Sequence, residues 1–426
     1  MSDVVTRDPD GGMFRALRHR NFRLYFFGQL TSLIGTWMQS VAQGWLMHRL
    51  TDSAFMLGLL GFCQFLPVMV VSPWAGVVAD RVDKRRLLLI TQSFALLQAV
   101  ALATLVSLGV VQPWMVLALA FAFGVFSAFD LPARQSFLVE MVGREDLPNG
   151  IALNSMAFNT ARVIGPAIAG VLVATIGEAG CFWLNGLSYV AVLFSLWRIV
   201  VPRHVDEREP GSALSTLQEG VRYAWSVGPI RNLLLLLGFT AGLGFQYQIL
   251  LPVYTRDILH AGPGVYGMLV SAFGIGSLLS ALLMTRKLNR WGLRRNLLIG
   301  LTSGGIGMAV FAWSHWLPLT LAMGFLAGFG LILYVATTNT MLQLTTEDRF
   351  RGRIMSLYTL MFVGTAPLGA LASGWIAQRY GAPIATSFSA LVLLGGALWM
   401  SYRLRVIAAR EAAVPPPGAG ATEKLG

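Results

Sequence analysis

Arg162 is a charged residue in the middle of an otherwise apolar stretch, residues 151–175. If that stretch is a membrane helix that rises 1.5 Å per residue, Arg162 lies roughly 16 Å deep, near the centre of the bilayer. A guanidinium there costs roughly 3 kcal/mol or more, so it must face protein or water. Two roles stay open. It contacts an anionic substrate group or responds to a proton, or it bonds carbonyls, Asn159 or an unpaired helix end as a structural element.

A stripe of polar side chains runs along residues 22–48. Its members are three or four residues apart, so they share one face of a helix that lipid would not tolerate. They are Gln29, Ser32, Thr36, Gln39 and Gln43. Two later apolar stretches contain comparable residues: Thr240, Gln246, Tyr247, Tyr334, Thr338 and Asn339. With Arg162, these residues predict a water-filled substrate cavity; hydrogen bonding between helices is the alternative.

Charged residues also gather in the segment 76–86 and near the end of residues 114–133. They predict a conformational latch that consists of Gly76, Asp80, Arg81, Lys84, Arg85, Asp130 and Arg134. The helix must pack closely at Gly76, and Asp80 can meet a helix N-terminus or a basic side chain of another part of the protein. Breaking that contact would bias one conformation against another. The alternative is a basic loop that only sets topology.

The composition requires lipid around the elements that position these residues. Hydrophobic residues make up 55% of the 426 and charged residues 12%, whereas soluble domains have about 25% charged residues. A membrane-crossing helix needs about 20 apolar residues. Twelve stretches meet this need: 22–48, 54–79, 87–108, 114–133, 151–175, 179–200, 230–256, 264–285, 296–314, 316–342, 354–378 and 383–403.

The distribution of Lys and Arg predicts the orientation. The net charge is +12, but the basic residues form short clusters between apolar stretches and not one face that would bind nucleic acid. With both termini in the cytoplasm, 28 of the 32 Lys and Arg lie on the cytoplasmic side, as the bias of basic residues towards that side requires. We therefore expect a multi-pass protein of a bacterial inner membrane.

The sequence repeats itself. Residues 80–90, shifted by 209, meet residues 289–299 with six identities, and Glu145-Asp146 recurs as Glu347-Asp348. Two parallel six-helix halves are typical of one class of transporter. We predict a cytoplasmic tail (1–21), the N-terminal half (22–200), a linker (201–229), the C-terminal half (230–404) and a disordered tail (405–426).

The linker contains an amphipathic pattern. Leu214, Leu217, Val221 and Trp225 share one face of a helix. We expect this helix to lie on the cytoplasmic leaflet, with Ser215 or Thr216 as its cap.

The segment 76–86 resembles the signature of the major facilitator superfamily, Gly-x-x-x-Asp-Arg-x-Gly-Arg-Arg, except that Asp83 stands where glycine is usual. Residues 130–170 look like the branch of enterobactin-exporter-like and macrolide-efflux-like proteins, and the resemblance covers roughly residues 14–404. It implies twelve helices in two pseudo-symmetric halves, and it implies that Asp130, with Lys84 as partner, helps to lock the closed form. Gly165 and Pro166 should bend the fifth helix and allow close packing.

These observations predict an all-α secondary transporter that exports a small amphipathic organic molecule, such as a drug, a macrolide or a siderophore, by alternating access. An importer of the same fold and a non-transporting membrane sensor or assembly factor are the alternatives. The sequence has no P-loop and no hydrolase motif, so we expect neither an enzyme nor a bound cofactor. Proton coupling follows from the resemblance alone, since no acidic residue lies clearly at mid-membrane. Lipids and the solute are the expected partners of a monomer.

Overall fold

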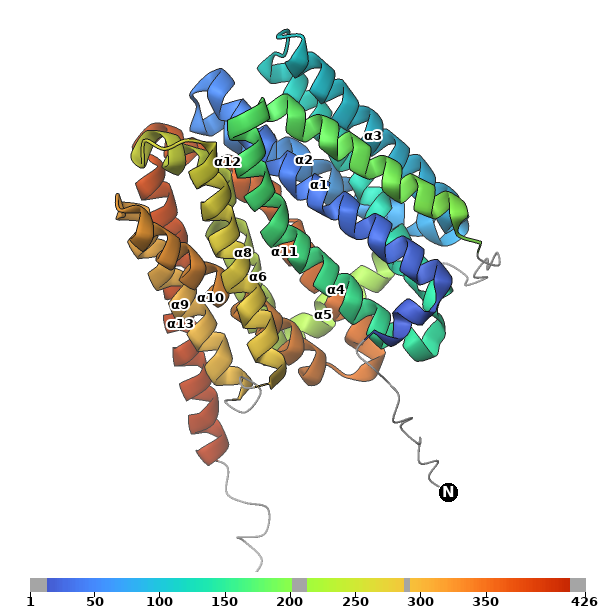
Figure 1. The fold of residues 1–426 in the computed structure, drawn as a ribbon. Helices are drawn as coiled ribbons and strands as arrows, with labels where there is room; N and C mark the ends of the chain where they lie inside the picture. Colours follow the sequence, from blue (N-terminus) through green and yellow to red (C-terminus); the bar gives the residue numbers. More distant parts are fainter. Residues whose placement is uncertain (1–13, 201–212, 287–291, 414–426) are drawn as a thin grey trace, which may run out of the picture.

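The computed structural model describes residues 14–200, 213–286 and 292–413, and every regular element in these ranges is helical. The predicted all-α class is therefore confirmed. The N-terminal half contains η1 (Arg15–Arg18), α1 (Arg20–Thr51), α2 (Ala54–Arg81), α3 (Lys84–Ser107) and α4 (Pro113–Arg198). The C-terminal half follows in Figure 1 as α5 (Ala213–Ser226), α6 (Gly228–Gly244), α7 (Tyr247–Val253), η2 (Tyr254–Ile258), α8 (Pro263–Arg286), α9 (Leu293–Trp313), α10 (Leu317–Thr345), η4 (Asp348–Phe350), α11 (Arg351–Val363), α12 (Ala366–Tyr380) and α13 (Ala382–Ala413).

α4 is one run of helical residues that supplies three membrane crossings. Its backbone leaves helical angles at Gly143 (φ 71°) and Gly177 (φ 77°), in the left-handed region that glycine adopts without steric cost. The predicted gap between the fourth and fifth crossings, residues 134–150, is instead helical on both sides of Gly143. The fourth crossing therefore continues beyond its predicted end.

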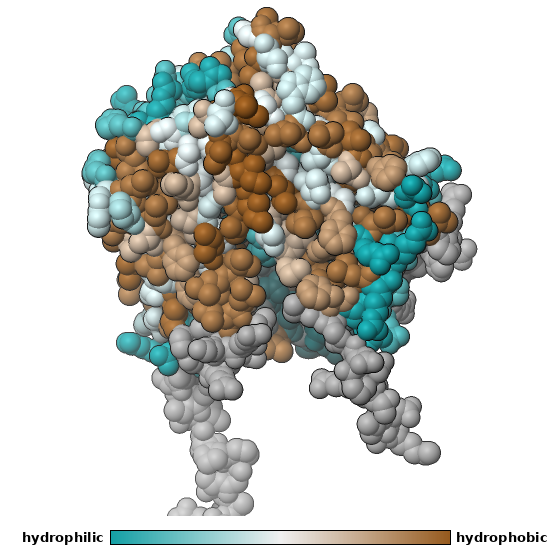
Figure 2. All heavy atoms as spheres, viewed as in Figure 1, coloured by the Kyte–Doolittle hydropathy of each residue, from teal (hydrophilic) through white to brown (hydrophobic). Residues whose placement is uncertain are grey.

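Ten segments of the described residues are long and apolar enough to cross a membrane. One of them, Glu145–Arg198, is divided at Gly177 and supplies two crossings. The 32-residue α1 is not among the ten, because its polar stripe lowers its hydropathy. With both included, the described residues are consistent with the twelve predicted crossings. Hydrophobic residues cover most of the face in Figure 2, and hydrophilic residues gather towards the ends.

The seventh and eleventh crossings are each interrupted, which the sequence does not predict. The seventh passes from α6 to α7 at Phe245–Gln246 and ends in the π-helical turn η2. The eleventh passes from α11 to α12 at Gly364–Thr365. Pro367 stands in the first turn of α12, where a residue without an N–H is well tolerated. Interrupted helices of this kind are common beside transporter cavities.

A short helix begins each half and is docked on the longer helices of that half. Arg15 of η1 places its Nε 2.7 Å from Asp146 Oδ1 on α4. Arg353 of α11 places its NH1 2.7 Å from Glu219 Oε2 on α5. The two docking sites lie at corresponding places of the repeat, beside Glu145-Asp146 and Glu347-Asp348. The internal repeat therefore extends beyond the crossings.

The predicted amphipathic helix corresponds to α5. Val221 and Trp225 are 42% and 58% exposed, so the protein leaves this apolar face uncovered. The side chains of the other predicted face and cap residues lie outside the described part of the structure, as do residues 201–212 and 414–426. The predicted disordered tail begins inside α13, which is helical to Ala413.

The two halves meet towards one end of the bundle, which we call the far end (Figure 1). The opposite end, where α1 begins and α13 ends, is called the termini end. At the far end α2 packs on α12, and α4 packs on α8. A Cβ atom added at Gly58 would lie 2.8 Å from Gly374 Cα, and one added at Gly267 would lie 2.6 Å from the carbonyl oxygen of Pro166 and 2.8 Å from Gly170 Cα. Glycine therefore allows both helix pairs to touch through their backbones.

We expect Gly267→Ala to lower the free energy of unfolding by about 1–3 kcal/mol, because the added methyl group forces α8 away from α4. Thermal unfolding in detergent measures the change. Gly395→Ala is the control, since a Cβ at Gly395 meets no atom within 4 Å. Equal unfolding temperatures for the two variants would show that α4 and α8 do not approach this closely.

Candidate transport cavities

Three cavities lie between the helices of the described residues. The first, of about 710 Å³, is lined by the N-terminal half; the second, of about 910 Å³, lies between α4 and the C-terminal half; the third, of about 270 Å³, lies towards the far end. Phe65 of α2 and Phe158 of α4 line all three. The three cavities therefore adjoin one another at these two aromatic side chains.

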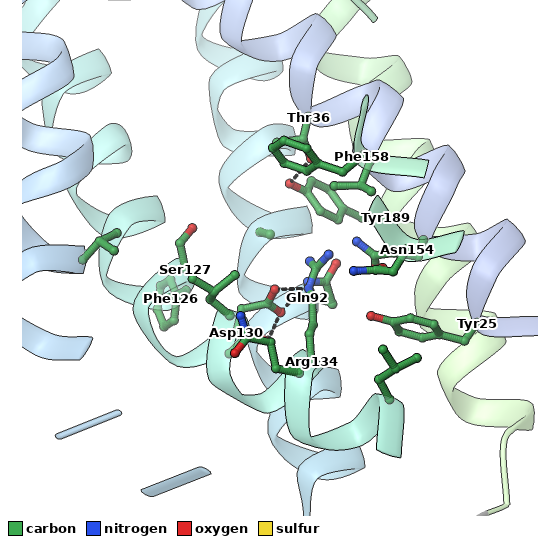
Figure 3. Close-up of a pocket in the computed structure, with 18 of the residues that line it drawn as sticks. Tyr25, Thr36, Gln92, Phe126, Ser127, Asp130, Arg134, Asn154, Phe158 and Tyr189 are labelled. Carbon is green, nitrogen blue, oxygen red and sulfur yellow. Dashed lines mark hydrogen bonds and ion pairs between the residues drawn. The ribbon is translucent and has the colours of Figure 1, made fainter. Parts of the chain in front are cut away.

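The first cavity contains a buried carboxylate, which Figure 3 shows from close by. Asp130 of α4 is 9% exposed and forms an ion pair with Arg134, one helical turn later. Asp130 Oδ1 also accepts hydrogen bonds from Thr91 Oγ1 at 2.7 Å and from Gln92 Nε2 at 2.6 Å. All these partners belong to the N-terminal half. In this conformation Asp130 and Arg134 therefore form part of a cavity wall and do not connect the halves, as a latch would require.

The family resemblance predicts that Lys84 pairs with Asp130, and the structure contradicts this prediction. Lys84 Nζ lies instead 2.8 Å from Glu140 Oε1 on α4. The helix register explains the correction, since α3 and α4 are antiparallel and Asp130 lies level with Thr91. Lys84 precedes Thr91 by seven residues, about 10 Å along α3. Its partner is therefore Glu140, which lies further along α4, level with the N-terminus of α3.

Two residues of the segment 76–86 stabilise helix ends. Arg85 donates hydrogen bonds to the carbonyl oxygens of Leu196 and Trp197, both at 2.7 Å, where α4 ends. Asp83, which replaces the glycine of the family signature, caps α3 by accepting a hydrogen bond from the backbone N–H of Arg86 at 2.9 Å. N-terminal capping of this kind is a common role of aspartate.

The predicted close packing at Gly76 is wrong for this conformation, because a Cβ added there would meet no atom within 4 Å. Gly76 lies towards the termini end of α2, whereas the close backbone contact of this helix with the C-terminal half is at Gly58, near the far end. Arg81 is exposed. The side chain of Asp80 lies outside the described part of the structure, so its contact with the other half stays a prediction.

Part of the polar stripe on α1 faces the cavities. Gln29 and Thr36 line the first cavity, and Gln43 lines the third. The Nε2 atoms of Gln29 and Gln43 are buried without a hydrogen-bond partner in the structure. Unpaired buried amides are costly, so these two atoms are available to water or a solute.

The rest of the stripe joins helices. Gln39 Nε2 donates to Gln98 Oε1 at 2.9 Å, and Gln39 Oε1 accepts a hydrogen bond from Asn185 Nδ2 at 2.8 Å. Ser32 is 1% exposed and lines none of the three cavities. The cavity prediction is wrong for Gln39 and Ser32, because neighbouring helices cover their side of α1.

The polar residues of the C-terminal half divide in the same way. Gln246, Tyr247 and Asn339 line the second cavity. Thr240 and Tyr334 line none of the cavities, because their hydroxyl groups are 2.8 Å apart and join α6 to α10. Thr338 is also buried away from the cavities, where its Oγ1 donates to the carbonyl oxygen of Tyr334 at 2.9 Å.

Arg162 lines the second cavity, and its contacts reach both halves. Its NH2 donates to the hydroxyl of Tyr247 at 3.4 Å, and its guanidinium lies 5.9 Å from the centre of the Trp37 ring. Among the described residues, no carboxylate lies within 4.0 Å of this guanidinium, and its Nε is buried without a hydrogen-bond partner. Asn159 bonds the carbonyl oxygen of Ser155 instead. A cationic group therefore faces the cavity without a counter-charge nearby.

Gly165 and Pro166 allow the close packing that the sequence predicts. A Cβ at Gly165 would lie 2.7 Å from Trp37 Cβ, so the glycine brings α4 against α1. Both residues lie within α4, whose backbone departs from helical angles at Gly143 and Gly177 and not at this point. The breaks at Gly143 and Gly177 lie in the predicted connections between crossings, whereas at Gly165 and Pro166, where a bend is predicted, the backbone keeps helical angles.

Phe65, Phe158 and Trp37 are among the cavity residues that the sequence does not single out. Phe158 packs edge-to-face on Trp37, with ring centroids 5.8 Å apart. An aromatic residue within an apolar stretch gives no signal of which way it faces. Gln92 was detectable, because it is a polar residue within an apolar stretch.

Two helical halves that touch at one end and enclose cavities lined in part by polar side chains define a multi-pass membrane transporter of the major facilitator class. The family described as transmembrane secretion effector matches residues 11–418, so the chain belongs to this family. Membership identifies a transporter and not an enzyme, as the sequence predicts.

Curated relatives agree with this family. The staphyloferrin A transporter of Staphylococcus aureus is 27% identical over 84% of this chain and 90% of its own length. The multidrug efflux pump Tap of Mycolicibacterium fortuitum is 27% identical over 84% of this chain and 89% of its own length. The enterobactin exporter EntS of Escherichia coli is 25% identical over 84% and 85%. The predicted branch is confirmed.

A solved structure supports the fold alone. The crystal structure of a mutant form of the nucleoside transporter NupG aligns with a TM-score of 0.73 at 14% identity, covering 90% of this chain and 99% of its own.

We expect Glu140→Lys to reduce the amount of folded protein, because Lys84 is 9% exposed and would face a second cation. The exchange Lys84→Glu with Glu140→Lys should restore most of the loss, measured as monodisperse protein by fluorescence-detected size exclusion. The matched exchange Lys84→Glu with Asp130→Lys should leave the amount of folded protein low, because position 84 would then face the unchanged carboxylate of Glu140. Rescue by this second exchange would instead support a Lys84–Asp130 pair.

Proposed function

We propose that this chain is a secondary active exporter of a small amphipathic organic molecule that has an anionic group, in the inner membrane of a bacterium. The named functions of its relatives, siderophore transport and multidrug efflux, support this substrate class. The chain acts as a monomer in lipid and alternates between states that open to each side of the membrane.

The observation that carries the proposal is Arg162. A guanidinium near mid-membrane is retained where a counter-charge repays its desolvation, and the described residues supply none within ion-pairing distance. An anionic solute group would supply it. Tyr247, Asn339 and Gln246 add hydrogen-bonding groups, while Phe65 and Phe158 offer apolar contact to the rest of the solute.

The charge distribution supports an orientation with both termini in the cytoplasm. Lys84, Arg85 and Arg134 lie towards the termini end, whereas the far end has Arg49, Arg256 and Arg379. Since the halves touch at the far end, the structure corresponds in this orientation to a state that loads its solute from the cytoplasm.

Protons are the energy source that fits the first cavity. Asp130 is buried, lines the cavity and is paired with Arg134. A proton on Asp130 would cancel its charge and release Arg134, so protonation would change the cavity wall. We therefore propose Asp130 as the proton-binding residue of an antiport cycle, in place of the latch role.

We expect Arg162→Ala to weaken solute binding about tenfold or more, because a hydrogen bond to a charged group contributes about 1.5–3 kcal/mol. Complementation of a deletion strain on a panel of siderophores and drugs measures the effect. Arg162→Lys should retain part of the activity, and the exposed Arg222→Ala is the control. Full resistance in cells with Arg162→Ala at equal protein abundance would exclude this role.

We expect Asp130→Asn to abolish solute accumulation driven by a pH gradient in inverted vesicles while solute binding persists, because asparagine cannot exchange a proton. Substrate-induced proton release, followed with a pH-sensitive dye, is the second measurement. Proton release equal to that of the unmodified protein would assign the proton to another residue.

A further inference from the structure

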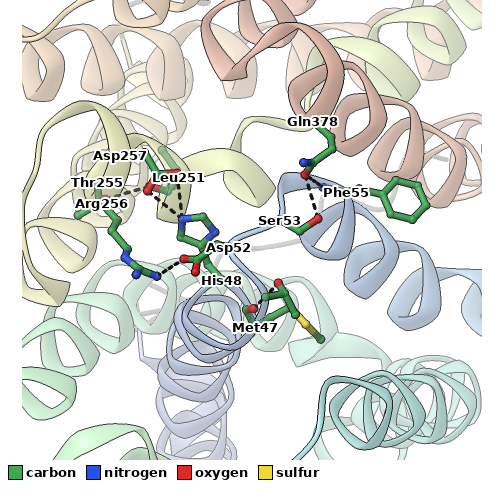
Figure 4. A network of polar contacts seen from close by, with 11 residues as sticks. Met47, His48, Asp52, Ser53, Phe55, Leu251, Thr255, Arg256, Asp257 and Gln378 are labelled. Carbon is green, nitrogen blue, oxygen red and sulfur yellow. Dashed lines mark hydrogen bonds and ion pairs between the residues drawn. The ribbon is translucent and has the colours of Figure 1, made fainter.

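Two ion pairs cross between the halves at the far end, and Figure 4 shows them together. His48 Nε2 of α1 lies 3.1 Å from Asp257 Oδ2 of η2. Arg256 NH1 of η2 lies 2.7 Å from Asp52 Oδ1, just after α1. Each half thus contributes one acidic and one basic residue. A simple sliding of the halves would bring like charges together, so the arrangement fixes one register.

A neutral contact extends this network to the eleventh crossing. Ser53 Oγ donates to Gln378 Oε1 at 2.9 Å, and the backbone N–H of Phe55 donates to the same oxygen at 3.3 Å. Ser53 also caps α2 by accepting a hydrogen bond from the Met56 N–H. The turn between α1 and α2 is therefore bonded to the C-terminal half on two sides, through η2 and through α12.

Local backbone geometry presents these side chains. Asp52 has φ 46°, in the left-handed region that aspartate tolerates better than most residues, and it ends α1. Arg256 and Asp257 belong to the π-helical turn η2, where an extra residue in the turn redirects side chains. Such turns are frequent at functional sites.

Burial separates the two pairs. The His48 side chain is 2% exposed, whereas Asp257 is 48% exposed and the Arg256 and Asp52 side chains are 41% and 70% exposed. An exposed pair contributes little in water. The contact between His48 and Asp257 therefore contributes more to the closed far end than the exposed pair does. Separation of the halves would break this contact and expose His48.

Another ion pair lies beside His48, inside the N-terminal half. On the same helix as His48, Arg49 is paired with Glu178 of α4, with Nε 2.7 Å from Oε1. Because both belong to the N-terminal half, this pair does not resist separation of the halves. Arg49 and Glu178 thus pair with each other, and Asp257 pairs with His48.

We propose that His48 and Asp257, together with Asp52 and Arg256, form a far-end latch whose closure is promoted by protonation of His48. Opening of the far end must break both pairs and bring His48 into contact with water. Histidine is the side chain that ordinarily changes charge between pH 5 and 8. Burial of the ring opposes its charged form, whereas the Asp257 carboxylate at 3.1 Å favours that form. We take the direct contact with the carboxylate to be the stronger of the two effects in the closed state, and the sign of the pH dependence tests this.

The direction of this effect suits an exporter. If the far end faces the exterior, as the proposed function has it, external acid would close the emptied transporter and return its cavities to the cytoplasm. His48 acts here as a sensor that positions the halves, and it carries no proton across the membrane. Only this sidedness rests on the proposed function. The latch and its pH dependence are independent of it.

The test measures the far-end opening directly. In the Cys63→Ser, Cys181→Ser background, nitroxide labels at Val110→Cys and His315→Cys report the distance between the halves in lipid nanodiscs by pulsed electron paramagnetic resonance. Both positions are exposed. We expect a short distance at pH 5 and a growing population of a longer distance towards pH 8.

Variants identify the residues responsible. His48→Gln and Asp257→Asn should each increase the long-distance population several-fold and remove its dependence on pH. Glu178→Gln, which breaks the neighbouring pair inside one half, is the matched control and should change neither. The exchange Asp52→Arg with Arg256→Asp should retain the short distance, whereas Arg256→Asp alone should not.

Two results would overturn the latch: a pH dependence that persists in His48→Gln, or an opening in Glu178→Gln equal to that in Asp257→Asn. If His48→Gln is not monodisperse, Asp257→Asn and the exchange variant decide the question. Because no solute is used, a negative result here is distinct from failure of the proposed export, which only the transport measurements test.

Discussion

Backbone contact at glycine is the interaction on which the arrangement of the two halves depends. In lipid, apolar side chains gain little by leaving one apolar surrounding for another, so helices associate through close packing and hydrogen bonds. Gly58 meets Gly374, and Gly267 meets Gly170, both towards the far end. Gly58 and Gly267 are related by the 209-residue offset of the internal repeat. The symmetric contact fixes the halves at one end and leaves volume for cavities elsewhere.

Pairing of charges is the second constraint. In the N-terminal half, Asp130 is neutralised by Arg134 and Lys84 by Glu140, while Arg85 satisfies the carbonyl groups at the end of α4. Arg162 differs from these residues because its contacts are a phenol and an indole. The contrast matters more than the depth of Arg162 alone, because the other charged residues that line the first cavity or lie beside it have a partner of opposite charge.

The helices, the repeat and the family were predictable from the sequence, because apolar length and basic loops follow directly from the lipid solvent. The partners of side chains were not. Lys84 binds Glu140 and not Asp130, since the register of α3 against α4 is set by packing along both helices. Gln39 joins helices although it shares a stripe with Gln29, because spacing identifies a face and not its neighbours. The breaks before α7 and α12 likewise depend on tertiary contact.

Phe65 and Phe158 border every cavity described above, and this has a consequence for how the protein changes over generations. A single nucleotide change in a phenylalanine codon can yield leucine, serine or tyrosine. Such a change at either site would alter the lining of all three cavities at once and leave the buried ion pairs and the glycine contacts in place. The shape of the space offered to a solute can therefore change through a single codon.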